Sequence, residues 1–582
     1  MTRTATSITE RVGRSAFSIV EMLWAMTRTT GSDDGPGHRR LESDLHHTTE
    51  TDRGVCLNAS NRSVSEGLYR WWCQDYAPLD GRLRAVVYGL LLYFAVRGSI
   101  FGAPALLRDL PAPLYQPPTF MGWLQAIGLS QPVLIDLLTV LQVPFAVLWA
   151  LAVIGLGGRW PLRLTGCLAL LFYGSQQGCV GTGHGWHLPV ATLFVCGWLI
   201  RQDQWSVDAL VARRWPAWPF NPARWAGAAD LSPFARKLVL LLAVYTLFAG
   251  GVTKLVQGGW RWMDGVSLNH YLAWHNDPST AFGNWLLPWL LTHPGVVAAL
   301  SVSTVVFELG AIAVLFWPRW RWPFFIAANG FHLGIYFVMI PRFFEQMTVY
   351  LMLVPWDALA NARGLERIKV LFGVHWLPPR TVLTVPKPRV RRGLLLLTSG
   401  VIGLLVWTLA RQREWFPLTH IPMYSTYLSD QRVGMIPRTE FDSLDGLHRI
   451  AHSDNNHDLP WWTRYEIARR LLFQAVTADG QVTLLASPFP GMRLNRLTWA
   501  QRISFALLDD LRTISPDEPI STAKLKSVRM AMDATAGRIW DGPAGDQFVE
   551  FRLLMTAAEE PPVLLLAVSR TNSLGPPSEL GD

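Results

Sequence analysis

Long runs of apolar residues, separated by polar segments, dominate this chain between residues 83 and 411. A helix needs roughly 20 mainly apolar residues to cross a membrane, and fewer when its ends are buried in protein. The runs do not show the alternation of apolar and polar residues that a membrane β-barrel requires. The pattern predicts a polytopic α-helical membrane protein with about nine transmembrane helices, near residues 83–100, 132–157, 161–177, 187–201, 236–253, 295–317, 322–340, 346–358 and 393–411.

The composition favours the same class of protein. Only 16% of the 582 residues are charged, against about 25% in soluble domains, while 50% are hydrophobic. The 28 tryptophans suit the membrane interfaces, where an indole ring can contact both lipid and water. The formal net charge of +9 reflects basic loops beside the membrane, so we expect membrane lipid and no nucleic acid as a partner.

Arginine and lysine residues follow the second, fourth, sixth and eighth predicted helices, and the other loops are poor in both. Basic loops stay in the cytoplasm, which predicts an integral plasma-membrane protein with a cytoplasmic N-terminus and its C-terminal domain outside. The predicted outer loops, 101–131, 178–186, 254–294 and 341–345, hold the polar residues that could do chemistry: His184, His187, Lys254, Asp264, His270, His275 and Glu345.

The chain can be divided by composition. We expect a disordered cytoplasmic segment (1–67), a transmembrane bundle (68–358), a basic cytoplasmic loop (359–392), a last transmembrane helix (393–411) and an exoplasmic α+β domain with a disordered tail (412–582). The first outer loop carries Pro111, Pro113, Pro117 and Pro118 and is expected to be a non-helical cap. In the last domain the periodicity predicts helices at 461–476 and 497–512 and strands at 481–486, 548–556 and 562–569.

One cation lies at the end of an apolar run. Lys254 follows the run Leu238–Gly251 and precedes Trp260. A lysine at this depth is costly unless its side chain reaches the membrane surface or serves a function. The default interpretation is an interfacial anchor, because a tryptophan such as Trp260 is typical of the membrane surface. The alternative is a catalytic base.

A set of short motifs occurs in a fixed order around Lys254. They are Tyr69-Arg-Trp-Trp72, His184-Gly-Trp-His-Leu188, Trp205-Ser-Val-Asp208, Gly250-Gly-Val-Thr-Lys-Leu255, Phe316-Trp-Pro-Arg319 and Asn329-Gly-Phe-His332. In this order and spacing they resemble the transmembrane domain of vitamin K-dependent gamma-carboxylase, known as the horizontally transferred transmembrane (HTTM) domain, over residues 68–358.

The resemblance implies a function for Lys254. It would be the weak base that takes a proton from a reduced quinone (vitamin K or menaquinone hydroquinone), whose reaction with oxygen drives removal of a γ-proton from glutamate before carbon dioxide adds. The resemblance places His184 as the residue that stabilises an anionic intermediate, with His187 as the second candidate. We add His187, Trp260, Glu308 and His332 as candidate cofactor-binding residues.

Each of these residues also has a structural interpretation. His184 could be an exposed loop histidine, and His332, inside a predicted span, could make a polar contact within the bundle. Glu308 would need a partner or would be protonated: it could pair with a cation on another span, with Arg97 as one candidate, or make a structural hydrogen bond. Asp264 is expected to cap a short helix that begins near Val266. The histidine spacing matches no known metal motif, so we predict no metal site.

The C-terminal domain shares no motif with the corresponding part of the carboxylase, which puts a protein or peptide substrate at that domain in doubt. The first hypothesis is an enzyme that oxidises a reduced quinone and carboxylates a substrate at the exoplasmic face. The alternative is a non-enzymatic membrane protein of the same fold that serves export, immunity or assembly of a partner. A transporter is less favoured, because the spans show no internal repeat.

Overall fold

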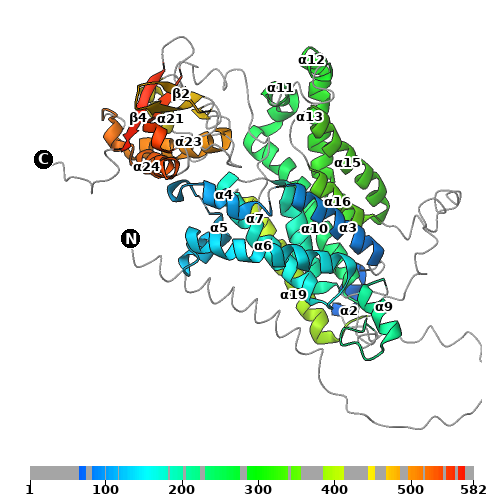
Figure 1. Ribbon diagram of the computed structural model, residues 1–582. Coiled ribbons are helices and arrows are strands. Elements are labelled where there is room, and N and C mark those ends of the chain that lie inside the picture. Colours follow the sequence, from blue (N-terminus) through cyan, green and yellow to red (C-terminus); the bar gives the residue numbers. More distant parts are fainter. Residues whose placement is uncertain are drawn as a thin grey trace, which may run out of the picture. The chain divides into compact units, whose positions relative to one another are not determined.

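The structure is a computed structural model of the whole chain (Figure 1). It describes residues 64–73, 81–98, 100–115, 117–180, 184–200, 205–222, 230–274, 285–338, 343–354, 385–411, 443–452, 467–468, 470–485, 496–515, 518–541, 545–556 and 562–570. The chain divides into two compact units. The first comprises 1–81, 199–238 and 355–406, and the second comprises 82–198, 239–354 and 407–582.

Helices make up most of the described chain before residue 411. The α-helices are α2 (Val64–Cys73), α3 (Gly81–Arg97), α4 (Ala103–Asp109), α5 (Thr119–Ala126), α6 (Gln131–Ile154), α7 (Trp160–Val180), α8 (His187–Leu199), α9 (Val207–Arg214), α10 (Ser232–Gly258), α11 (Val266–Trp274), α12 (Leu286–Leu291), α13 (Pro294–Gly310), α14 (Ala313–Phe316), α15 (Arg321–Val338), α16 (Phe344–Leu353) and α19 (Pro388–Arg411). Short 3₁₀ helices lie between them: η1 (Ala112–Leu114), η2 (His184–Trp186), η4 (Gly259–Asp264) and η5 (Pro318–Trp320).

Four of these helical segments, within the described residues, are long and apolar enough to cross a membrane. They are Gln131–Ile154, Ser232–Asp264, Pro294–Phe316 and Pro388–Ala410. The prediction of about nine spans was therefore wrong in number. Helices form at the other predicted spans, but α3, α8 and α16 have only 17, 13 and 10 residues. Helices α7 and α15 are longer, yet each carries an arginine in its first turn and further polar residues inside.

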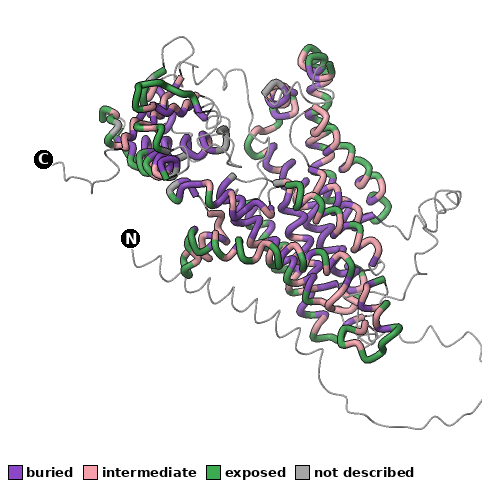
Figure 2. The backbone as a smooth tube through the Cα atoms, viewed as in Figure 1, coloured by how far each residue is buried: buried purple, intermediate pink, exposed green. Residues whose placement is uncertain are grey.

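The long helices expose apolar side chains and bury a narrow face, as expected for helices in lipid. On α13 the buried residues are Val297, Ser301, Val305 and Glu308, while Val306 is 62% exposed. Figure 2 shows exposed residues along the outer sides of α13 and α15. Helix α10 is the most enclosed of the four, with 67% of its apolar window buried against 22% to 33% in the others. It is therefore the central helix on which a buried site can be built.

Two glycines bring α7 and α8 into backbone contact. A Cβ atom on Gly166 would lie 2.7 Å from Cα of Phe194, and one on Gly197 would lie 2.5 Å from the carbonyl oxygen of Leu162. Small residues at such crossings let the backbones of membrane helices approach closely. The two glycines fix how α7 and α8 cross, near the beginning of α7 and the end of α8.

In the first unit, α2 packs against the beginnings of α10 and α19. Tyr69 stacks on Phe234 at 6.1 Å between ring centroids, and the ammonium group of Lys237 lies 5.6 Å from the ring centroid of Trp72. Arg391 of α19 is 3.4 Å from Glu66. The Tyr69–Trp72 motif therefore belongs to helix α2, which begins at Val64.

The segment 101–131 was predicted to be non-helical, and this prediction was wrong. It contains α4, η1 and α5. The prolines do not interrupt these helices: Pro111 and Pro118 lie directly before η1 and α5, and Pro113 occupies the first turn of η1. Proline is tolerated at these positions, because the first helical residues have no intrahelical hydrogen bond to lose.

The C-terminal domain combines helices with an antiparallel sheet. The strands are β1 (Leu471–Thr477), β2 (Val482–Leu484), β3 (Phe548–Met555) and β4 (Val563–Ser569), in the order β2-β1-β3-β4, and the helices are α21 (Leu444–His452), α23 (Arg496–Thr513) and α24 (Lys526–Trp540). Strand β1 pairs with β3 so that Phe473 faces Leu553. Phe473 also stacks on Phe551 at 5.6 Å and contacts Trp499 of α23 at 4.9 Å, which places the core between the sheet and that helix.

The α+β class of this domain is confirmed, as are the helix near 497–512 and the strands near 481–486, 548–556 and 562–569. The helix predicted at 461–476 was wrong at its end, because Leu471–Thr477 is strand β1. Residues 453–466 lie outside the described residues, as do the predicted disordered segment up to residue 63 and the tail after residue 570.

Candidate functional site

Lys254 lies on the last turns of α10 and forms a buried ion pair with Glu308 of α13. Its Nζ atom is 2.8 Å from Oε1 and 2.9 Å from Oε2 of the carboxylate. Each residue is only 4% exposed. The default interpretation of Lys254 as an interfacial anchor was therefore wrong, because its side chain turns into the bundle. Charged groups in such a place are rare and usually functional or tightly paired.

The two glycines before Lys254 make room for its partner. A Cβ atom on Gly250 would lie 3.5 Å from Oε1 of Glu308, and one on Gly251 would lie 3.0 Å from the Cβ atom of Glu308. Any side chain at Gly251 would push α13 away from α10. The Gly-Gly-Val-Thr-Lys sequence thus places a small surface and a cation on the helix face that receives the carboxylate.

The short helix η4 covers the ion pair from the side. The Nζ atom of Lys254 is 5.3 Å from the ring centroid of Trp262, which is 1% exposed. The face of an indole ring attracts a cation, and this attraction is stronger away from water. Asp264 ends η4 and accepts a 2.8 Å hydrogen bond from the backbone N–H of Val266, the first residue of α11. The predicted cap at Asp264 is confirmed.

Two other sequence-based expectations concern this region. Glu308 was expected to pair with a cation on another span, which is correct, but the cation is Lys254 and not Arg97. Arg97 ends α3 with its guanidinium 5.9 Å from the ring centroid of Tyr93. Trp260 was proposed to bind a cofactor, yet it is 76% exposed. Its side chain is therefore not part of an enclosed site.

The histidines occupy other places in the bundle. His332 of α15 is 4% exposed, and its Nε2 atom is 3.0 Å from the hydroxyl of Tyr350 of α16. His187 begins α8, is 4% exposed and contacts the ring of Tyr173 edge-on at 5.6 Å. His184 begins η2, and its side chain lies outside the described part of the structure. The structure therefore unites Lys254 with Glu308 and gives His187 and His332 aromatic partners elsewhere.

A metal centre is not formed by the described residues, which contain no group of three histidine, cysteine, aspartate or glutamate side chains close enough to hold an ion. His270 lies on α11, and His275 lies outside the described residues.

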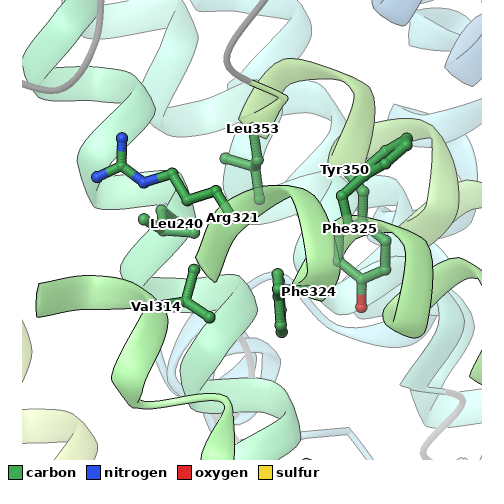
Figure 3. A pocket seen from close by; sticks show the side chains of 7 residues that line it. All are labelled: Leu240, Val314, Arg321, Phe324, Phe325, Tyr350 and Leu353. Atoms are coloured by element: carbon green, nitrogen blue, oxygen red, sulfur yellow. The ribbon is translucent and has the colours of Figure 1, made fainter. Parts of the chain in front are cut away.

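A pocket opens between α10, α14, α15 and α16. Its lining residues are Leu240, Val314, Arg321, Phe324, Phe325, Tyr350 and Leu353 (Figure 3). In this view the nitrogen atoms of Arg321 and the phenolic oxygen of Tyr350 lie on opposite sides of the apolar residues. Leu240 precedes Lys254 by about 21 Å along α10, at 1.5 Å per residue. The pocket is thus distinct from the ion pair.

Arg502 is among the buried cations that the sequence did not reveal. Arg502 of α23 is 4% exposed and donates hydrogen bonds to the carbonyl oxygens of Cys179 (2.8 Å) and Gln177 (3.2 Å) at the end of α7. The amphipathic pattern of α23 gives no sign that this arginine is buried by a segment more than 300 residues earlier.

Comparison with protein-family models, with curated proteins and with solved structures finds no match for this chain. The resemblance to the gamma-carboxylase family stays a prediction from the order and spacing of the sequence motifs.

Proposed function

We propose that this protein is a membrane enzyme of the gamma-carboxylase type, in which Lys254 accepts a proton from a reduced quinone near the exoplasmic surface. The observation that carries the proposal is the Lys254–Glu308 pair, which is buried among apolar helices at the motif that resembles the carboxylase. The proposal includes the orientation given by the basic loops, with a cytoplasmic N-terminus and an outer C-terminal domain.

The pair can supply a base although lysine is ordinarily protonated. A proton that moves from Nζ of Lys254 to a carboxylate oxygen of Glu308, 2.8 Å away, leaves a neutral amine and a neutral acid. Neutral groups are much less costly than charges in an apolar environment. The amine then has a free lone pair for a substrate proton, and Glu308 holds the proton that Lys254 gave up.

The residues fit the proton-accepting part of a quinone site. Both members of the pair are buried. The amine of Lys254 and the carboxyl group of Glu308 can donate and accept a proton, and they do not form a metal site. A reduced quinone, when bound, would supply with molecular oxygen the oxidative chemistry in which one oxygen atom enters the epoxide product and the other leaves as water. Lys254 and Glu308 are the residues that would act on its hydroxyl proton. His187 and His332 remain candidate binding residues.

Replacing Lys254 with arginine should separate base chemistry from helix packing. Arginine keeps the positive charge beside Glu308 but stays protonated, so it cannot accept the proton. We expect oxygen-dependent conversion of a vitamin K or menaquinone hydroquinone to its epoxide to fall by about 100-fold or more. The assay uses the full-length protein in detergent, with product measured chromatographically.

Lys237→Arg is the matched control, because Lys237 is a second buried lysine on α10, 1% exposed, outside the proposed site. It should leave turnover unchanged. Epoxide formation by Lys254→Arg at the wild-type rate, or no epoxide from a folded wild-type protein with several hydroquinones, would reject the enzyme proposal.

A second candidate is a non-enzymatic membrane protein in which the same pair only ties α10 to α13. It is favoured by the fact that Lys254 engages both oxygens of Glu308. On this view the C-terminal domain would bind a partner, and no residue of the pair would need to exchange a proton.

A further inference from the structure

Arg502 connects the C-terminal domain to the end of a helix in the bundle. Its Nε atom donates to the carbonyl oxygen of Cys179 and its Nη2 atom to that of Gln177. These carbonyls lie in the last turn of α7, where no further N–H group of the helix is available to them. A cation at this position also interacts favourably with the negative end of the helix dipole.

Arg502 is not the only residue that links the C-terminal domain to the end of α7. Gly178 lies between the two carbonyl groups, and a Cβ atom there would collide with the ring of Tyr115. Tyr115 follows η1, and η1 itself lies against α23 and α24 of the C-terminal domain. Arg502 and Tyr115 therefore hold the same turn of α7.

Arg502 remains charged at neutral pH in this place. Burial lowers its pKa to about 10, which is still far above pH 7. A buried guanidinium needs acceptors for its protons, and the carbonyl oxygens of Gln177 and Cys179 supply them.

We infer that the C-terminal domain fixes the end of α7 through Arg502, and that Arg502 is a positioning residue for the turn that carries His184 and His187. Helix α7 ends at Val180 and η2 begins at His184, so the chain between these residues can span at most about 14 Å. Because so few residues connect them, we expect a displacement of the last turn of α7 to be passed on to the beginning of η2. The catalytic part of this inference rests on the proposed function, in which His187 is a candidate binding residue, and on the sequence-based expectation that His184 stabilises an anionic intermediate.

The test is hydrogen exchange of backbone amides in the full-length protein, together with the hydroquinone assay. For Arg502→Met we expect amides in the last turn of α7 and at the beginning of α8 to exchange at least tenfold faster, because two charge-assisted hydrogen bonds are lost. The kcat should fall while the KM for hydroquinone stays within about twofold of the wild type. Arg502→Lys, which keeps the charge, should recover part of both effects.

Two further variants guard against misinterpretation. Gly178→Ala disturbs the same turn from the side of Tyr115 and should increase the same exchange rates. Arg512→Met removes an arginine of α23 that pairs with Asp509 at the surface, and should change neither readout. Unchanged exchange in Arg502→Met would overturn the inference, whatever Gly178→Ala does, and so would faster exchange with an unchanged kcat. If the wild type makes no epoxide, the proposed function fails, whereas the exchange rates still decide whether Arg502 holds α7.

Discussion

Replacing Lys254 with methionine is expected to lower the free energy of unfolding by about 3–5 kcal/mol. The substitution leaves the carboxylate of Glu308, which is 4% exposed, without its cation inside the bundle. A buried charge without a partner keeps its full desolvation cost, and the ring of Trp262, which contacts the ammonium group of Lys254, cannot replace that group. Unfolding by sodium dodecyl sulfate in mixed micelles measures the change. Glu308→Leu should cost a similar amount.

The double variant Lys254→Met/Glu308→Leu should recover most of this loss. Removing both charges eliminates the desolvation cost, and apolar side chains of similar volume fill the space between α10 and α13. The two single losses should therefore add to far more than the loss in the double variant. Additive losses would show that the pair does not act as a unit, and the account of the site would then be wrong.

Gly197→Ala is expected to destabilise the bundle by about 1–3 kcal/mol or more. The added methyl group would lie 2.5 Å from the carbonyl oxygen of Leu162 and 3.2 Å from Cα of Arg163. Both atoms belong to the backbone of α7, so neither can move without shifting the whole helix. The same unfolding measurement in mixed micelles tests this expectation.

The control for this variant is Gly334→Ala in α15. No atom lies within 4 Å of a Cβ placed on Gly334, and alanine is the better helix former by roughly 0.5–1 kcal/mol. We expect this variant to be neutral or slightly stabilised. Equal losses from both substitutions would contradict the close approach of α7 and α8.

The sequence identified the helical class with apolar helices long enough to cross a membrane, the α+β class of the last domain and the two members of the buried pair. Apolar runs predict helices well, because their backbone polar groups must be satisfied locally in lipid. They predict the number of spans poorly. Helix α16, with 10 residues, contains an apolar run but is too short to cross a bilayer alone.

The pairing of Lys254 with Glu308 could not be read from the chain. The two residues are 54 positions apart, and their contact depends on how α10 faces α13. The Gly250-Gly251 pair was a usable signal, since adjacent glycines before a cation suggest a close approach of another helix. The same limit applies to Arg502, whose acceptors lie on α7.

In the C-terminal domain the error at β1 has a local cause. The apolar residues of Leu471–Thr477 also fit the spacing of a helix that continues from the preceding residues. The segment is a strand because it pairs with β3. Helix α24 was missed, although its alanines and methionines favour a helix and could have revealed it.

The central claim is that the Lys254–Glu308 pair exchanges a proton with a substrate and does not serve packing alone. Turnover of a vitamin K or menaquinone hydroquinone by Lys254→Met/Glu308→Leu tests it most directly, because this variant should fold like the wild type but has no base at the site. The account predicts a stable protein that forms no epoxide above the rate without enzyme. Epoxide formation by the double variant at the wild-type rate would contradict it.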